Sequence, residues 1–198
     1  MRCFTFFPGD SYNLASLRGC VANFRRNALA ARPILVLPDE FLRKRAKRVR
    51  VINAPMQRLI DDMIDTMRKA HGVGLAAIQI GVLQRVAVIE IPEEDVRVLI
   101  NPEILRRGGE REVTEGCLSI PGYRGKLRRS VKVTARALDR HGKEIRIKAE
   151  ELLAQALEHE IDHLNGILYI DHLETHSNLW KLEPEAIDTE AATEAHSG

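Results

Sequence analysis

The chain of 198 residues lacks the features that mark several classes of protein. It has no uninterrupted apolar run near the roughly 18 residues that a membrane-spanning helix needs, so we expect no membrane partner. Its three cysteines, Cys3, Cys20 and Cys117, are too few and too scattered for a disulfide framework, which favours a reducing compartment. The contents of 44% hydrophobic and 29% charged residues are ordinary and predict a folded globular domain.

Charge is unevenly distributed along the chain. Residues 1–50 carry 11 Lys and Arg against 3 Asp and Glu, whereas residues 171–198 carry one Lys against 7 acidic residues. The basic excess includes the cluster at residues 43–50, which is interpreted either as a site that attracts RNA or an acidic partner, or as a solvated helix face. No aromatic residue lies within this cluster, so it offers single-stranded nucleic acid no stacking surface. We expect no DNA partner, and residues 183–198 are predicted to form an acidic flexible tail.

The first 31 residues differ in composition from the rest. They contain four Arg and one acidic residue, and their apolar residues recur at the spacing of an amphipathic helix. These apolar residues are Leu14, Leu17, Val21, Phe24 and Ala28. This N-terminal extension is interpreted either as an organelle transit peptide or as a lineage-specific extension or a start site placed too far upstream. We expect a cytoplasmic protein, or an organellar one if the extension is cleaved.

Two longer helices are predicted by apolar spacing and by end signals. One begins near Pro55 and ends at Gly72. The other runs from Glu150 to Leu164 and ends at Asn165-Gly166. Because the second helix is apolar around most of its circumference, we expect it to be buried.

A short helix is also expected from Pro38, and the remaining elements are predicted as strands. The expected strands are Val82–Ile91, Val96–Asn101, Ser130–Asp139, Glu144–Lys148 and Ile167–Asp171. This order predicts an α+β fold of mainly antiparallel β-sheets packed around a buried central helix. One catalytic domain is expected over residues 32–182.

The predicted buried helix carries His159-Glu160-Ile161-Asp162-His163. Histidines four residues apart lie on the same face of a helix and can bind one metal ion. Glu160 projects from the helix in a different direction from the two histidines, and there it can take a proton from a water bound to that ion. The alternative is a pair of core histidines that bond to backbone carbonyls. Asp162 is interpreted either as a carboxylate that orients a group near the metal or as a surface ion-pair partner.

Two histidines leave a catalytic metal one protein ligand short of the usual three. Tyr169 occupies the position at which one large protease class has a third histidine. The remaining candidates are His172, Glu174, Glu183 and Cys117. Cys117 lies in a short extended segment bounded by Gly and Pro, and a single cysteine is more often a small buried hydrophobe.

Three segments resemble the signature motifs of the peptide deformylases, in the order of that family. They are Gly72-Val73-Gly74-Leu75-Ala76-Ala77-Ile78-Gln79, Glu115-Gly116-Cys117-Leu118-Ser119 and the His159–His163 motif. The similarity extends over residues 33–182. It implies a metal-dependent hydrolase that removes the N-formyl group from the N-terminal formylmethionine of new polypeptides. It also implies one divalent metal bound by Cys117, His159 and His163, with Fe(II) expected and Zn, Ni or Co as alternatives.

The resemblance assigns three catalytic roles. Glu160 is expected to take a proton from the metal-bound water that attacks the formyl carbon, and to deliver it to the leaving amine. The Gln79 amide and the Leu118 backbone N–H are expected to hold the oxyanion.

The resemblance also assigns residues to the binding of an extended peptide that pairs as an added strand. The substrate-binding residues implied are Val73, Gly74, Val113, Gly116, Arg124, Leu152 and Ala156. Gln155 departs from the family pattern, which has an aliphatic residue at this place in the methionine pocket. Arg124 is alternatively a solvent-facing loop charge.

Two other functions and one partner remain open. A related metallopeptidase would use the same helix, and a catalytically silent relative would bind metal or formylated peptides without turnover. The ribosome is an expected partner because the substrates are nascent chains. Some relatives use a basic C-terminal helix for this contact, but the tail here is acidic, so the cluster at residues 43–50 is the better candidate.

Overall fold

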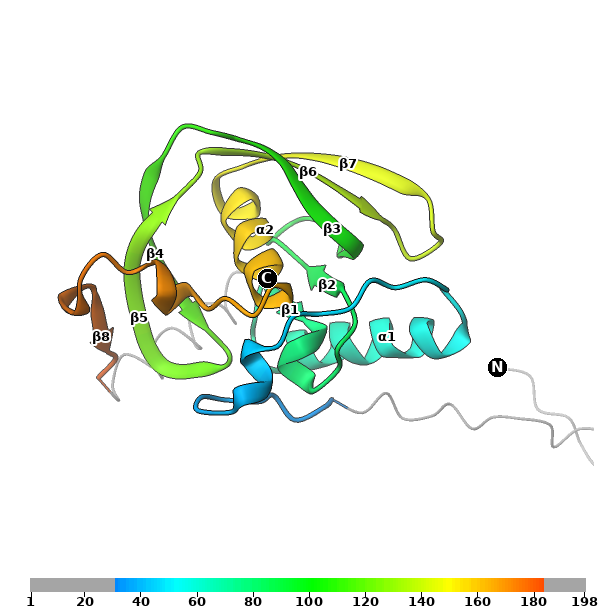
Figure 1. The fold of residues 1–198 in the computed structure, drawn as a ribbon, viewed down its shortest axis with the longest axis horizontal. Coiled ribbons are helices and arrows are strands. Elements are labelled where there is room, and N and C mark those ends of the chain that lie inside the picture. The colour runs from blue at the N-terminus through cyan, green and yellow to red at the C-terminus, as the bar shows by residue number, and fades with distance from the viewer. Residues whose placement is uncertain (1–30, 184–198) are drawn as a thin grey trace, which may run out of the picture.

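Two antiparallel sheets and two α-helices build the computed structural model of the protein, which describes residues 31–183 (Figure 1). The expected α+β class is therefore confirmed. The predicted N-terminal helix, Cys3, Cys20 and the acidic tail beyond residue 183 lie outside the described residues. Within the described residues, no helix is both long enough and apolar enough to cross a membrane.

The two α-helices begin and end close to the predicted positions. Helix α1 is Ala54–Lys69, and the Asn53 side chain accepts a hydrogen bond from the Met56 backbone N–H at 3.1 Å, which caps its first turn. Helix α2 is Glu151–Leu164 and carries the two histidines of the motif. The short helix expected from Pro38 is the 3-10 helix η2, Glu40–Arg43.

The larger sheet has five strands in the order β1-β2-β3-β6-β7, all antiparallel. The strands are β1 (Gly74–Ala76), β2 (Val86–Ile89), β3 (Arg97–Gly108), β6 (Lys132–Leu138) and β7 (Glu144–Glu150). The 3-10 helix η3, Ala77–Ile80, connects β1 towards β2. Within residues 31–183, strand β1 pairs with β2 alone and therefore lies at the edge of this sheet.

The centre of this sheet is covered on both faces (Figure 1). In β2, Ala87 and Ile89 belong to the core cluster that contains Leu157 of α2. The alternate residues Val86 and Val88 pack with the apolar residues of α1. All four residues of β2 are consequently buried, and α2 lies deep inside the protein as expected.

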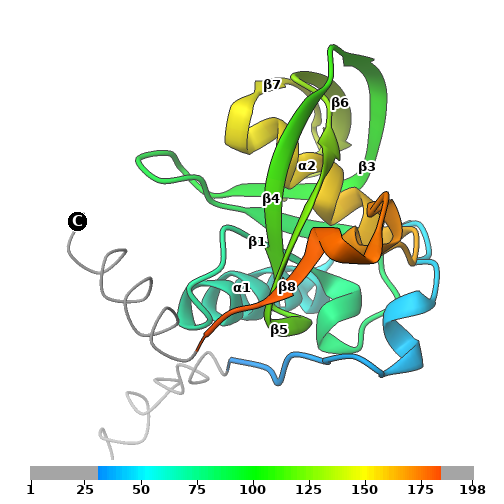
Figure 2. The ribbon, with the colours of Figure 1, turned by 90° about the vertical axis from the view of Figure 1, so that its left-hand side faces the viewer.

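The smaller sheet has three strands in the order β4-β5-β8, also antiparallel. They are β4 (Arg111–Cys117), β5 (Ile120–Arg129) and β8 (Leu179–Lys181), and β8 follows the 3-10 helix η5 (His176–Asn178). Figure 2 shows β4 and β5 as long strands beside α2. Strands β4 and β5 form a hairpin whose turn follows Cys117, and β4 is an edge strand.

Three local expectations are wrong. A strand is expected at Ile167–Asp171, but Tyr169–His172 form the 3-10 helix η4. The reason is a pair of hydrogen bonds between Leu168 and Asp171. The Asp171 carboxylate accepts from the Leu168 N–H at 2.8 Å, and the Asp171 N–H donates to the Leu168 carbonyl. The strand expected at Val82–Ile91 is shorter, since it begins only at Val86. The basic cluster is not a helix face, because η2 ends at Arg43.

Candidate functional site

Three side chains predicted as metal ligands converge beside α2. The ligand atoms of Cys117, His159 and His163 lie within 4.8 Å of one another. Cys117 Sγ is 3.2 Å from His163 Nε2, and the ring centroids of the two histidines are 4.9 Å apart. Their positions follow from the fold, because β4 ends at Cys117 and the two histidines are one turn apart on α2.

The chemistry of this group fits a divalent transition metal. One sulfur and two imidazole nitrogens form a ligand set that suits Zn(II) or Fe(II) and leaves a position for water. Burial holds the pKa of His163 well below its ordinary value, so its ring is neutral and offers a lone pair. Burial also acts to lower the pKa of His159, but Cys117 and Glu115 outweigh it and raise this pKa. The negative potential that these two groups create at His159 would also favour a bound cation.

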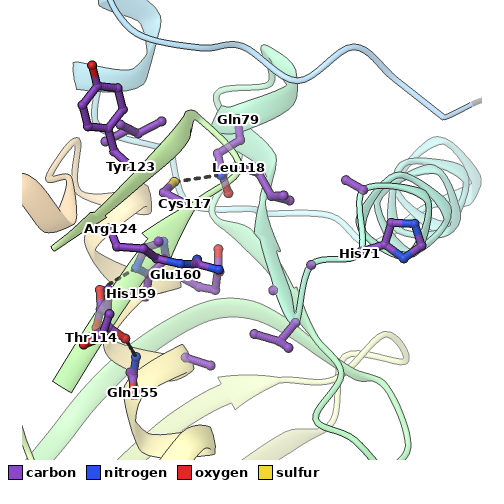
Figure 3. A pocket seen from close by; sticks show the side chains of 18 of the residues that line it. His71, Gln79, Thr114, Cys117, Leu118, Tyr123, Arg124, Gln155, His159 and Glu160 are labelled. Carbon is purple, nitrogen blue, oxygen red and sulfur yellow. Dashed lines mark hydrogen bonds and ion pairs between the residues drawn. The ribbon is translucent and has the colours of Figure 1, made fainter. Parts of the chain in front are cut away.

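Glu160 is a buried carboxyl near Cys117 and His159 (Figure 3). Its Oε2 has no hydrogen-bond partner within residues 31–183, although it is fully shielded from solvent. Burial raises the pKa of Glu160 to about 7, a value suited to accepting and returning a proton at neutral pH. A Cβ atom on Gly74 would lie 2.3 Å from Glu160 Oε1, so glycine in β1 provides the space for this carboxyl.

The Gln79 side chain is held in one orientation at the other side of Cys117. Its Oε1 accepts a hydrogen bond from the Ala76 N–H at 2.8 Å, which directs the amide nitrogen toward the hairpin. There Nε2 lies 3.2 Å from Ser119 Oγ and 3.7 Å from Cys117 Sγ. Leu118 follows Cys117 in the turn and lines the same cavity.

A buried network of charges contacts His159, one of the three predicted ligands. Its Nδ1 donates to Glu115 Oε2 at 2.8 Å, and Glu115 in turn forms an ion pair with Arg129 at 2.8 Å. Arg129 also pairs with Asp162 at 2.6 Å, and Asp162 contacts His172 Nε2 at 2.8 Å. The His159 and Arg129 contacts lower the pKa of Glu115 to about 2 although its burial acts to raise it.

This network decides between the alternatives left open for Asp162 and His172, and it includes two further residues, Glu115 and Arg129. Asp162 is a buried ion-pair partner, and His172 binds Asp162 and is not in the ligand group. The roles of Glu115 and Arg129 were not predicted. Glu115 lies two residues before Cys117, a spacing that places both side chains on one face of β4 and was an available signal. Arg129 lies two residues after the buried Leu127, so strand alternation places it on the inward face of β5, whereas the neighbouring Arg128 is exposed.

A cavity of about 620 Å³ opens in front of these groups. It is lined by six of the seven residues expected to bind substrate, Val73, Gly74, Gly116, Arg124, Leu152 and Ala156. Val113 lies elsewhere, in the core cluster that contains Leu127 and Tyr169. Arg124 extends from β5 into the cavity (Figure 3), and a Cβ on Gly116 would lie 1.8 Å from its guanidinium.

Two sheet edges border the cavity. Strand β1 contributes Gly74 and strand β4 contributes Thr114 and Gly116 to its lining, and each strand is at the edge of its sheet. Edge strands present backbone N–H and C=O groups that can pair with an added peptide strand. The cavity can therefore accept an extended peptide whose end lies at the proposed metal ligands.

Comparison with known proteins gives consistent matches. The family model described as polypeptide deformylase matches residues 31–178. The peptide deformylase of Dehalococcoides mccartyi strain BAV1 is 55% identical over 158 residues, which cover 79% of this chain and 95% of the relative. A crystal structure of a peptide deformylase from Legionella pneumophila is 46% identical with a TM-score of 0.71 and covers 84% of this chain and 99% of its own. That of the Synechococcus elongatus enzyme in complex with actinonin is 40% identical with a TM-score of 0.72 and covers 74% and 80%.

Proposed function

The chain belongs to the polypeptide deformylase family of metal-dependent hydrolases, and we propose that it removes the formyl group from the N-terminal formylmethionine of new polypeptides. The observation that carries the proposal is the meeting of Cys117, His159 and His163 beside the buried carboxyl of Glu160. A divalent ion held by these three ligands would act as a Lewis acid toward water and the formyl oxygen.

Glu160 is proposed as the group that moves the proton. It accepts a proton from the attacking water and returns it to the amine that leaves when the C–N bond breaks. Its pKa of about 7 suits both transfers. Its unpartnered Oε2 supports this role, because a buried carboxyl oxygen without a protein partner is costly unless a water or substrate binds it.

The Gln79 amide and the Leu118 backbone N–H are proposed to stabilise the negative charge that develops on the formyl oxygen. The hydrogen bond from the Ala76 N–H holds the Gln79 carboxamide so that its N–H groups face the site before substrate arrives. Such preorganised donors lower a barrier by about 3–4 kcal/mol each.

The substrate is proposed to bind as a strand between the edges of β1 and β4. Backbone pairing near Val73, Gly74 and Gly116 would give affinity for many sequences, which an enzyme acting on every new chain needs. The apolar side chains of Leu152 and Ala156 would contact the methionine. Arg124 is proposed to lie along the path of the peptide beyond it.

A direct assay distinguishes this function from its alternatives. Purified enzyme is mixed with formyl-Met-Ala-Ser and with Met-Ala-Ser, and released formate and amino acids are both measured. We expect formate from the first peptide and no cleavage of the second, with loss of turnover in Glu160→Gln. A metallopeptidase would cleave the unblocked peptide, and a silent relative would bind the formylated peptide without producing formate.

The metal is proposed to be Fe(II), which tolerates a thiolate ligand as zinc does. The ligand set alone does not select among Fe, Zn, Ni and Co. Anaerobic purification followed by elemental analysis of the protein identifies the ion, and zinc as the main metal of an active preparation would contradict this choice.

The ribosome is proposed as a partner and the cytoplasm as the location. Arg43 and Arg48 of the basic cluster form ion pairs with Asp171 and Glu103. Lys47 and Arg50 have no ion-pair partner within residues 31–183 and line a second cavity. They are the better candidates for contact with ribosomal RNA. Cosedimentation with ribosomes should weaken in the double charge reversal Lys47→Glu and Arg50→Glu; unchanged cosedimentation would refute this contact.

A further inference from the structure

One amide side chain lies in the otherwise apolar part of the cavity wall. Gln155 lines the cavity between Leu152 and Ala156 of α2. Figure 3 shows its carboxamide directed at Thr114 of β4, and Nε2 donates to the Thr114 carbonyl oxygen at 3.2 Å. The amide is thus tied to the sheet edge and lies beside the proposed methionine site.

This tether uses only part of the hydrogen-bonding capacity of the amide. A glutamine carboxamide has two donor hydrogens and an acceptor oxygen. Within residues 31–183, the bond to Thr114 is the one hydrogen bond that the structure gives for the Gln155 side chain. One N–H and the oxygen remain for a ligand. Because Nε2 is anchored, its second N–H has a restricted direction and can select the position of an acceptor.

We propose that Gln155 determines side-chain specificity, and that it extends the substrates of this site to peptides beginning with formylmethionine sulfoxide. The inference rests on the proposed function. Oxidation converts the thioether of methionine, a weak acceptor, into a polar and chiral sulfoxide of the same chain length. An apolar wall would offer the sulfoxide oxygen no hydrogen-bond donor of the protein. The free N–H of Gln155 supplies such a donor.

The same position explains why the amide does not exclude methionine. Gln155 is only partly buried, so an unused N–H can remain hydrated when the thioether is bound. Its methylene groups still present apolar surface to the substrate. A site rejects a less polar substrate mainly when binding leaves one of its own buried polar groups without a hydrogen-bond partner. Bound methionine does not cause this loss here, because the Gln155 amide keeps its contact with water.

The test compares kcat/KM for three formylated tripeptides that differ in the first residue: methionine, methionine sulfoxide and norleucine. Norleucine matches methionine in length and has no acceptor. The variant Gln155→Leu replaces the amide by an apolar group of similar size. Gln84→Leu makes the same change at an exposed position on the second cavity and is the matched control. Thermal melting confirms that all three proteins fold.

We expect Gln155→Leu to lower the sulfoxide-to-norleucine ratio of kcat/KM by about tenfold, the effect of one hydrogen bond, while Gln84→Leu leaves the ratio unchanged. The two sulfoxide epimers are assayed separately. An anchored N–H should favour one epimer by about fivefold in the unaltered protein, and Gln155→Leu should abolish this preference.

An unchanged ratio in Gln155→Leu, or equal rates for both epimers in the unaltered protein, would overturn the inference. Absence of turnover with the formylmethionine peptide would instead contradict the proposed function. The two failures are therefore distinguishable in one set of assays.

Discussion

Replacement of Arg129 by methionine tests whether the buried charge network stabilises the fold. Arg129 is 5% exposed and its guanidinium binds both Glu115 and Asp162. Methionine fills much of the same space without the charge. The variant leaves two buried carboxylates without their common cation, and Glu115 is the one that holds His159.

Two arguments give similar values for the loss of unfolding free energy in Arg129→Met. Removing one partner of a buried ion pair costs about 3–5 kcal/mol. The lowering of the Glu115 pKa from 4.5 to about 2 corresponds to about 3 kcal/mol of stabilisation, to which Arg129 and His159 both contribute. Because the folded pKa lies below the unfolded one, this stabilisation is complete above about pH 5 and is lost as the pH falls toward 2. We therefore expect Arg129→Met to lower the free energy of unfolding by about 3 kcal/mol at pH 7.

The assay is urea unfolding followed by circular dichroism, from pH 7 down to about pH 3, with a chelator present so that metal release does not contribute. The control Arg128→Met removes the neighbouring arginine, whose two ion pairs with Glu110 and Glu174 are exposed, and should change stability far less. The difference between Arg129→Met and the unaltered protein should shrink at low pH. Equal losses in both variants, or a difference independent of pH, would refute the reasoning.

Three further changes test the catalytic arrangement. Gln79→Leu should lower kcat roughly a hundredfold or more while the metal content stays intact, and loss of metal together with activity would contradict its assigned role. Gly74→Ala should lower kcat by about the same factor, because the alanine Cβ would lie 2.3 Å from Glu160 Oε1 and must displace this buried carboxyl. A kinetic assay that shows an unchanged kcat would count against Glu160 as the base. Removal of the metal by a chelator should abolish formate release, and anaerobic addition of Fe(II) should restore it, whereas full activity in protein shown by elemental analysis to be metal-free would exclude the proposed site.

Local patterns were sufficient for the part of the site that lies on one helix. The spacing of His159 and His163 and the apolar residues around them predicted both the burial of α2 and the shared face of the two ligands. The apolar spacing from Pro55 and the end signal at Gly72 likewise predicted α1. These features depend on interactions within a few residues, and a sequence pattern records them directly.

Long-range features were less accessible. The extent of β3 and the whole of β4 and β5 depend on pairing between segments that carry many charged side chains, so alternation is weak there. Arg129 is buried and Arg128 is exposed, in keeping with their alternate positions along β5, but the residues around Arg129 do not show which acidic partners it meets. These partners, Asp162 and Glu115, come within reach only when β5 lies against α2 and β4.

The charges of the network suggest why a buried arginine remains next to a metal site. Glu115 and Asp162 carry two negative charges and Arg129 one positive charge, which leaves one negative charge within the protein before the ligands are considered. A Cys117 thiolate adds a second, and a divalent cation would balance the two. Without Arg129, the negative excess would grow, and the pKa of Glu115 would rise because one of the two contacts that lower it would be lost. Arg129 thus binds the carboxylate that contacts His159, and it joins β4 and α2, the two elements that carry the proposed metal ligands.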